Sequence, residues 1–163
     1  MPFWVRVEHI TIGDTTTIIR DLERKFRKRW ADEAFPGNKI KELVEWMNTI
    51  RILRNTPAHC SRFYGRNFTY NPFLNGEDLK AICYEKESDV FKNKFKNNFF
   101  AEIIVLKILY HNLSEEDHLK WNAFINELER RLKSNNLDEI YLGFNNPWKD
   151  ALQIKIGSPA HSV

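Results

Sequence analysis

The fold is decided by the stretch K-I-K-E-L-V-E-W-M-N-T-I-R-I-L-R-N, which runs from Lys39 to Asn55. Its apolar side chains recur every three or four residues, at Ile40, Leu43, Val44, Met47 and Ile50, and the stripe ends at Leu53 or Arg54. This spacing places them on one side of an α-helix, where they can be buried against a neighbour. A Phe35-Pro36-Gly37 break precedes the stretch, because proline and glycine interrupt helices. The pattern therefore predicts a helix from about Lys39 to Asn55 with one buried face.

Other segments show the same helical spacing. A first helix is expected from Asp14, as its N-cap, to about Trp30. Its apolar positions recur every four residues at Ile18, Leu22, Phe26 and Trp30. Further helices are expected at 77–87, 91–110 and 114–133, with Ser114 as an N-cap, and a short one after a turn at 142–148. Residues 3–12, which Gly13 should end, fit a strand or a helix, and 62–77 are expected to be irregular. The predicted fold class is all-α, a helical bundle.

A single domain is expected over residues 1–163, because this length is typical of a domain with one core. Hydrophobic residues at 42% and charged residues at 29% are the composition of an ordinary globular protein. Cys60 and Cys83 form no C-x-x-C pair and have no histidine at the spacing of a zinc site, so no metal or other cofactor is expected. The sequence has no signal-peptide pattern and no apolar run of about 18 to 20 residues. We therefore expect a cytoplasmic protein with reduced thiols and no membrane partner.

Basic residues are concentrated in the first part of the sequence. Residues 1–70 hold 13 Lys and Arg against 8 Asp and Glu, whereas residues 71–163 hold 12 against 14. A basic region of this kind favours a partner that carries phosphates, although a solvated basic helix gives the same pattern. The charge alone leaves both interpretations open.

Residues that suit metal-free RNA cleavage lie together at the end of the predicted 39–55 helix. Such cleavage needs a base for the 2′-hydroxyl proton, an acid for the leaving oxygen and a cation for the phosphate. Histidine titrates in the range that the first two roles need, and arginine supplies a permanent charge for the third. The candidates are Arg51, Arg54, Asn55, His59, Arg62 and Arg66.

The geometry of a straight helix separates two of these candidates. Positions 54 and 59 would lie about 140° apart around its axis. Pro57 has no N–H and its ring disturbs a helix, so we expect it to bend the chain and aim His59 toward the phosphate that Arg54 holds. The alternative is that Arg54 and Asn55 form a plain helix cap and that His59 packs without a chemical role.

The run L-R-N-T-P-A-H-C-S-R-F-Y-G-R, from Leu53 to Arg66, resembles the LRN-x-x-AHH-x-R signature of abortive-infection (Abi) proteins of the AbiD and AbiF type, which belong to the HEPN superfamily. Three further blocks are similar to that family in the same order. They are P-F-W-V-R-V-E-H-I-T-I-G at 2–13, the tryptophan-bearing segment from Glu45 to Leu53, and L-G-F-N-N-P-W at 142–148. Four ordered blocks are much harder to obtain by chance than one short motif.

The resemblance implies an HEPN-like helical bundle that forms a homodimer and cuts RNA without a metal, each subunit lending its R-x-x-x-x-H motif to one cleft. Arg54 would neutralise the phosphate, Asn55 would have an orienting role, and His59 would be the acid or base. Cleavage by the 2′-hydroxyl would leave a 2′,3′-cyclic phosphate or a 3′-phosphate. The predicted RNA-binding set is Arg51, Arg62, Tyr64 and Arg66.

The sequence departs from the family pattern in three places. Cys60 stands where the family commonly has a second histidine, and Ser61 where some HEPN toxins carry a modifiable tyrosine. Family members also commonly have a further N-terminal half, which residues 1–163 are expected to lack.

The aromatic residues after the motif have two interpretations. Tyr64, Phe68 and Tyr70 are suited to stack on unpaired bases, but core packing is favoured because aromatic side chains bury readily in a small helical domain. The tryptophans at positions 4, 46 and 148 are assigned to the core.

The leading functional prediction is a metal-independent endoribonuclease of an abortive-infection or toxin-type antiviral defence system. RNA is the expected substrate, and a structured regulatory RNA is a further candidate partner. One alternative is a non-catalytic RNA-binding module, in which the basic segment from Arg20 to Arg29 holds a structured RNA. A second alternative is a scaffold protein that uses the interface only to pair.

Overall fold

The computed structural model describes residues 11–35, 40–59, 61–68, 70, 72, 74, 98–144 and 147–156. Every regular element in these residues is a helix, so the all-α prediction is confirmed for this part of the chain. The elements are α2 (Ile12–Asp21), α3 (Arg24–Ala34), α4 (Ile40–Ala58), α7 (Phe99–His111), α8 (Glu115–Ser134), the 3₁₀ helix η1 (Glu139–Leu142) and α9 (Trp148–Leu152). Residues 3–10 of the element expected at 3–12, the element expected at 77–87 and the start of the one expected at 91–110 lie outside the described residues.

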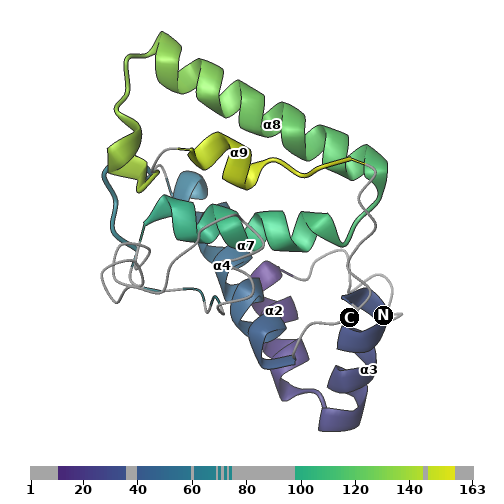
Figure 1. The fold of residues 1–163 in the computed structure, drawn as a ribbon. Helices are drawn as coiled ribbons and strands as arrows, with labels where there is room; N and C mark the ends of the chain where they lie inside the picture. Colours follow the sequence, from purple (N-terminus) through teal and green to yellow (C-terminus); the bar gives the residue numbers. More distant parts are fainter. Residues whose placement is uncertain are drawn as a thin grey trace.

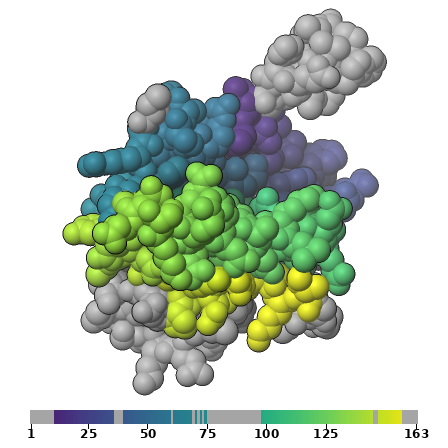
Figure 2. Space-filling model, turned by 90° about the horizontal axis from the view of Figure 1, so that it is seen from above, coloured from purple at the N-terminus to yellow at the C-terminus, as the bar shows by residue number. Residues whose placement is uncertain are grey.

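Helix α4 connects two groups of helices (Figure 1). Helices α2 and α3 pack against α4 on one side, and α7 packs against it with α8 and α9 beyond. Seen from above, α8 crosses the molecule, and residues near the end of α4 reach the surface beside it (Figure 2). The end of α4 is therefore placed where a partner can reach it. No helix in the described ranges is long and apolar enough to cross a membrane.

The core has two clusters of buried side chains. The larger joins α7, α8 and α9 and includes Phe100, Ile103, Ile104, Trp121, Ile125, Trp148 and Leu152. The smaller joins α3, α4 and α7 through Ala31, Leu43, Trp46, Val105 and Leu109. The exposed fraction is 0% for Trp46 and 3% for Trp148, which confirms their assignment to the core, whereas Trp4 lies outside the described residues.

The N-terminal end of α2 differs from the prediction. Thr11 is the N-cap: its hydroxyl accepts a hydrogen bond from the Asp14 N–H at 3.1 Å, and the Asp14 carboxylate accepts one from the Thr11 N–H at 3.0 Å. This reciprocal pair is a capping box, in which Asp14 is the third helical residue rather than the cap. Gly13 consequently lies inside α2 and does not end a preceding element.

The single helix predicted to reach Trp30 is two helices. The chain leaves the helical conformation at Leu22 and Glu23, where ψ is 141° at both residues. Both α2 and α3 then pack on α4. Arg27 stabilises the junction, because its Nη1 donates to the Arg20 carbonyl at 3.0 Å and so satisfies a carbonyl group near the end of α2.

Helices α8 and α9 agree with the prediction. Ser114 is the N-cap of α8, and its hydroxyl accepts a hydrogen bond from the Asp117 N–H at 3.3 Å. A short helix follows the turn before Trp148, as the sequence indicates. Packing between these two helices is reinforced by polar contacts, since the Trp121 indole N–H donates to the Leu152 carbonyl at 2.7 Å.

Candidate functional site

The predicted catalytic residues lie in the last turns of α4 and directly after it. The helix continues through Pro57 to Ala58. The His59 N–H still donates to the Asn55 carbonyl at 3.1 Å, which is the bond that an uninterrupted helix makes. Pro57 has no N–H, so it removes one backbone hydrogen bond of the helix. It does so in the last turn of α4, where little of the helix follows, and the loss is therefore small. Pro57 therefore does not break α4 before His59, and the re-aiming of His59 toward Arg54 stays a prediction.

Two of the three predicted catalytic side chains are exposed. Arg54 and His59 both lie in the exposed class, and Asn55 is half-buried between them. Arg54 Nη1 donates to Asn55 Oδ1 at 3.1 Å, so the amide restricts the orientation of the guanidinium without neutralising its charge. A phosphate and a ribose from solution can reach both exposed groups.

Arg54 and His59 do not share one face of α4. Five residues of regular helix rotate the chain by about 140° between them. No hydrogen bond joins their side chains in the part of the chain that the structure describes. Within one copy, the structure brings Arg54 to Asn55 but not to His59.

The other predicted RNA-binding arginines flank this helix end. Arg51 is half-buried at the contact with α2, where its Cδ lies 3.7 Å from the position that a Cβ on Gly13 would take. Arg62 and Arg66 are exposed in the turn after the helix. The Arg66 guanidinium lies 5.4 Å from the centre of the Phe68 ring, a cation–π contact that leaves its charge at the surface. Arg62 and Arg66 are thus available to an anionic partner.

The aromatic residues after the motif divide between core and surface. Phe68 is 3% exposed and belongs to the larger core cluster, which confirms the favoured interpretation for this residue. Tyr70 is half-buried, and its hydroxyl donates to Glu45 Oε2 at 3.1 Å. Tyr64 is also half-buried, and its hydroxyl accepts a hydrogen bond from the Asp138 N–H at 3.1 Å.

One residue near this turn was missed by the sequence reasoning. The Tyr141 ring, from η1, lies 5.4 Å from the Tyr64 ring. The Gly65 N–H donates to the Tyr141 carbonyl at 3.0 Å, so η1 is attached directly to the turn that carries Arg62 and Arg66. Nothing in the local sequence around position 141 signals this contact, because the two segments are far apart in the chain.

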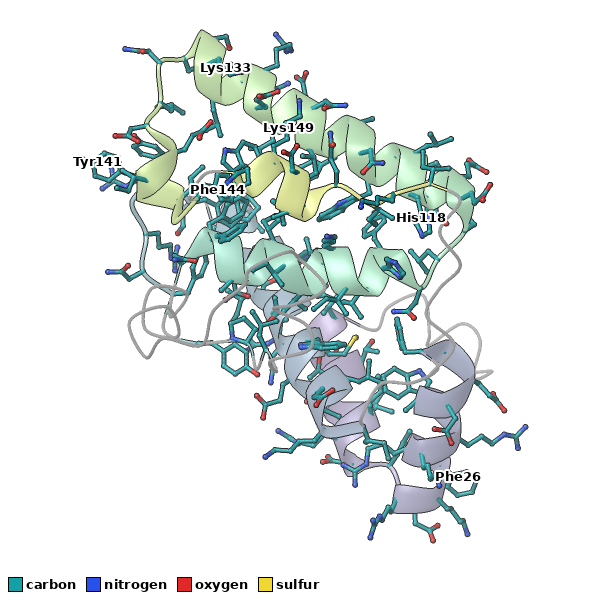
Figure 3. The ribbon with its side chains drawn as sticks, in the orientation of Figure 1. Phe26, His118, Lys133, Tyr141, Phe144 and Lys149 are labelled. Atoms are coloured by element: carbon teal, nitrogen blue, oxygen red, sulfur yellow. The ribbon has the colours of Figure 1, made fainter. Side chains whose placement is uncertain are left out.

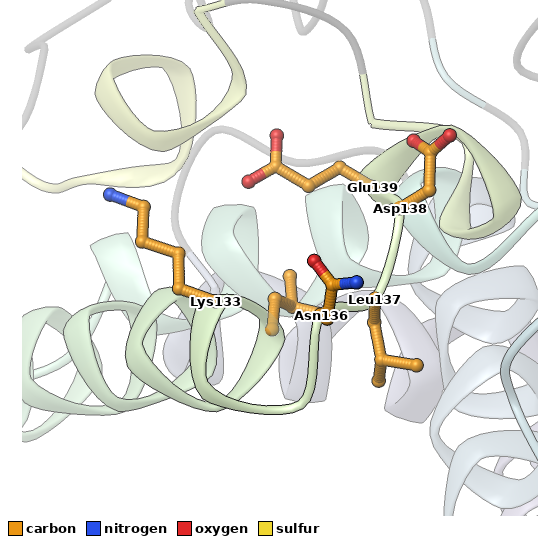
Figure 4. Close-up of a pocket in the computed structure, with 6 residues that line it drawn as sticks. Lys133, Asn136, Leu137, Asp138 and Glu139 are labelled. Atoms are coloured by element: carbon orange, nitrogen blue, oxygen red, sulfur yellow. The ribbon is translucent and has the colours of Figure 1, made fainter.

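A shallow hollow of about 370 Å³ lies at the C-terminal end of α8 (Figure 4). It is lined by Leu132, Lys133, Asn136, Leu137, Asp138 and Glu139. None of the predicted site residues lines it. Its lining holds one lysine and two carboxylate-bearing residues, so it has no excess of positive charge to attract a phosphate.

A buried carboxyl group lies away from the motif, on α7. Glu102 is 0% exposed, and neither of its carboxylate oxygens has a hydrogen-bond partner of normal geometry. Burial raises its pKa to about 7, and the neighbouring Thr49 hydroxyl offsets part of the shift. Among the described residues, no group of three or more His, Cys, Asp or Glu side chains is arranged to hold a metal ion.

Comparison with known proteins bears on the motif. Residues 1–65 match the family model described as Abi-like protein. The matched range includes Arg51, Arg54, Asn55 and His59 and ends one residue before Arg66. The Abi-like match thus covers less than half of the 163 residues and does not include the block at 142–148. No curated protein and no solved structure matches the chain.

Proposed function

We propose that this protein is a metal-independent endoribonuclease of an abortive-infection or toxin-type defence system, an HEPN-type enzyme of the AbiD and AbiF kind. RNA is cleaved by attack of the 2′-hydroxyl on the adjacent phosphate. The observation that carries the proposal is the exposure of Arg54 and His59 at the end of α4, within the residues that match the Abi-like family.

Each motif residue has a chemical role that its surroundings permit. The cationic Arg54 guanidinium neutralises the negative charge of the phosphorane-like transition state. Asn55 fixes one edge of that guanidinium through the 3.1 Å hydrogen bond. The His59 imidazole, which is exposed to solvent, exchanges a proton with the ribose hydroxyl or the leaving oxygen.

A second copy of the chain supports this chemistry better than one copy alone. The reaction uses both a base and an acid, and each motif supplies one imidazole. His111 and His118, whose rings lie 5.9 Å apart, do not supply the second, because this pair lies where α7 ends and α8 begins, away from the end of α4. Figure 3 labels His118. Pairing of two α4 ends across a two-fold axis brings two imidazoles and two guanidinium groups to one cleft.

The nuclease proposal is tested by incubating the purified protein with labelled single-stranded RNA in excess EDTA. Cleavage is expected to continue and to leave 2′,3′-cyclic phosphate or 3′-phosphate ends. His59→Ala and Arg54→Ala are each expected to lower the rate by about 100-fold or more, the usual contribution of an acid–base group or a charge-stabilising group. Arg131→Ala is the matched control, because Arg131 is an exposed arginine on α8 whose charge pairs with Glu127 at 2.8 Å. Undiminished cutting by either motif variant, or loss of cutting in EDTA, contradicts the proposal.

The composite cleft is tested by dilution with an inactive partner. Wild-type chain is co-refolded with a nine-fold excess of the Arg54→Ala/His59→Ala double variant, at a fixed total concentration. If both copies are needed, activity falls to about one hundredth, because only pairs of two wild-type chains are active. A fall to about one tenth means that each copy cuts alone and removes the dimer from the proposal.

A non-catalytic RNA-binding module is the second candidate, and α3 is the observation that favours it. Its exposed cations are Arg24, Lys25, Lys28 and Arg29. An RNA affinity that falls steeply with salt, is reduced by an Arg24→Glu/Lys28→Glu variant, and comes with no cleavage would identify this function instead.

A further inference from the structure

Tyr141 is a large aromatic residue held at the surface rather than in the core. Its exposed fraction is 59%, and its neighbour Ile140 is 65% exposed. Figure 3 shows Tyr141 at the outer edge of the molecule, whereas Phe144, two residues past the end of η1, lies inward against the core. Phe144 stacks on Trp148 with ring centres 4.5 Å apart and is 3% exposed. The burial of Phe144 therefore fixes η1, and Tyr141 is left facing solvent.

The surroundings of Tyr141 hold its ring in place. Its carbonyl accepts the Gly65 N–H at 3.0 Å, and its N–H donates to the Asp138 carbonyl at 3.3 Å. On one side the ring meets Tyr64 at 5.4 Å, with a tilt of 49° between the ring planes. Tyr64 is itself fixed, because its hydroxyl accepts the Asp138 N–H. A tyrosine ordered in this way loses little conformational entropy when a planar ligand stacks on it.

The charges around this tyrosine pair suit an unpaired nucleotide. Arg62 and Arg66 are exposed in the turn that also carries Tyr64, so phosphates are attracted to the side of that turn. The carboxylate of Asp138 accepts the Ile140 N–H at 3.0 Å, as the cap of η1. Negative charge there disfavours a phosphate over Tyr141 but not the uncharged face of a base. A base would therefore lie over Tyr141, and the phosphates of the backbone would lie beside Arg62 and Arg66.

The turn also lies close to the motif along the chain. Five residues separate His59 from Tyr64, which limits the distance between their backbones to about 18 Å even if the chain were fully extended. A single strand whose phosphate lies at His59 can therefore place a nucleotide a few positions along the strand at Tyr141.

We infer that Tyr141, supported by Tyr64, is a stacking platform for an unpaired base of the RNA, next to the backbone position at Arg62 and Arg66. The inference rests on the proposed function and adds to it a substrate class: RNA that is single-stranded beside the cleaved linkage. Stacking on an aromatic side chain tolerates any base, so the platform selects unpaired RNA over duplex RNA rather than a sequence.

The test measures binding of a short single-stranded RNA by the His59→Ala protein, so that cleavage does not interfere. Adding Tyr141→Leu is expected to weaken binding by about 5-fold to 100-fold, the usual effect of losing one stacked base. Adding Tyr141→Phe, which keeps the ring, is expected to change it by less than about 2-fold. Phe124→Leu is the control, because Phe124 is 43% exposed and rests on the Trp121 ring at 5.6 Å, far from the turn. A perfectly paired duplex is expected to show no difference between the Tyr141 variants.

The outcomes separate this inference from the proposed function. If Tyr141→Leu binds single-stranded RNA as well as its parent does, or if Tyr141→Phe loses as much affinity as Tyr141→Leu, the stacking platform is refuted even where the wild-type protein cuts RNA. If the two variants differ as expected and the wild-type protein cuts nothing, the platform stands and the nuclease proposal fails.

Discussion

Replacing Glu102 with glutamine is expected to remove a pH dependence from the stability of this protein. The Glu102 carboxyl is 0% exposed, and burial raises its pKa from 4.5 to about 7. Between these two pH values the folded protein keeps a proton that the unfolded chain has lost. The free energy of unfolding therefore falls as the pH rises from about 4.5 to about 7, and the loss is complete above the folded pKa.

The size of the effect follows from the shift. A difference of one pKa unit corresponds to about 1.4 kcal/mol, so the shift from 4.5 to about 7 corresponds to about 3 kcal/mol. Near pH 5 the protonated acid and the amide are both neutral, and Glu102→Gln should match wild type within about 1 kcal/mol. Near pH 8.5 the variant should be more stable by about 3 kcal/mol, because the wild-type protein must then bury a carboxylate.

Urea unfolding, followed by circular dichroism at both pH values, measures this difference. Titration of all other groups cancels when variant and wild type are compared at the same pH. Glu115→Gln is the control, since Glu115 is exposed in the first turn of α8, and its effect should be about 0.5 kcal/mol or less at either pH. Equal effects of Glu102→Gln near pH 5 and near pH 8.5 would refute the reasoning.

Four further substitutions test the local structure. Gly143→Ala should destabilise the protein by about 2 to 4 kcal/mol in thermal or urea unfolding, because φ is +81° and the new Cβ would lie 2.2 Å from Asn98 Nδ2. Gly65 also has a positive φ, of +67°, but open space surrounds it. Gly65→Ala should therefore destabilise the protein by only about 1 to 2 kcal/mol. Pro57→Ala should raise the free energy of unfolding by about 1 to 2 kcal/mol, because the helix already passes through this position and alanine favours a helix. RNA cleavage should be unchanged, and a loss of cleavage would show that the proline has a role in it. Thr11→Ala should cost about 1 kcal/mol by removing the cap of α2, and an unchanged melting temperature would contradict the capping box.

Helix signals that act over a few residues were readable from the sequence. Ser114 was predicted to cap α8, and it does so, because the capping hydroxyl and its amide partner are only three residues apart. The break at Leu22 and Glu23 was not predictable, since both residues are compatible with a helix and the periodicity of apolar residues continues across it. Its cause is tertiary: α2 and α3 each pack on α4, and the chain turns between them.

In the candidate site, too, features that depend on a few neighbouring residues were predictable, and contacts between distant segments were not. Arg54, Asn55 and His59 were found as a motif, and their exposure at a helix end is compatible with the predicted roles. Tyr141 was not found, because its contact with Tyr64 joins two segments that only the folded chain brings together. The burial of Glu102 was equally hidden, since a single glutamate in an apolar helix does not reveal which side faces the core.

The continuity of α4 through Pro57 bears on the requirements for catalysis. A bend there would have let one copy of the chain direct both Arg54 and His59 at the same phosphate. In a continuous helix, Arg54 and His59 lie about 140° apart around the axis of α4. One copy can then present its guanidinium or its imidazole to a given phosphodiester linkage more readily than it can present both. Completion of the site would then come from outside the helix, and in the proposed dimer a second α4 end would supply the missing groups. If RNA is cut with the motif residues in this geometry, dependence on pairing follows from the continuity of the helix rather than from the family resemblance.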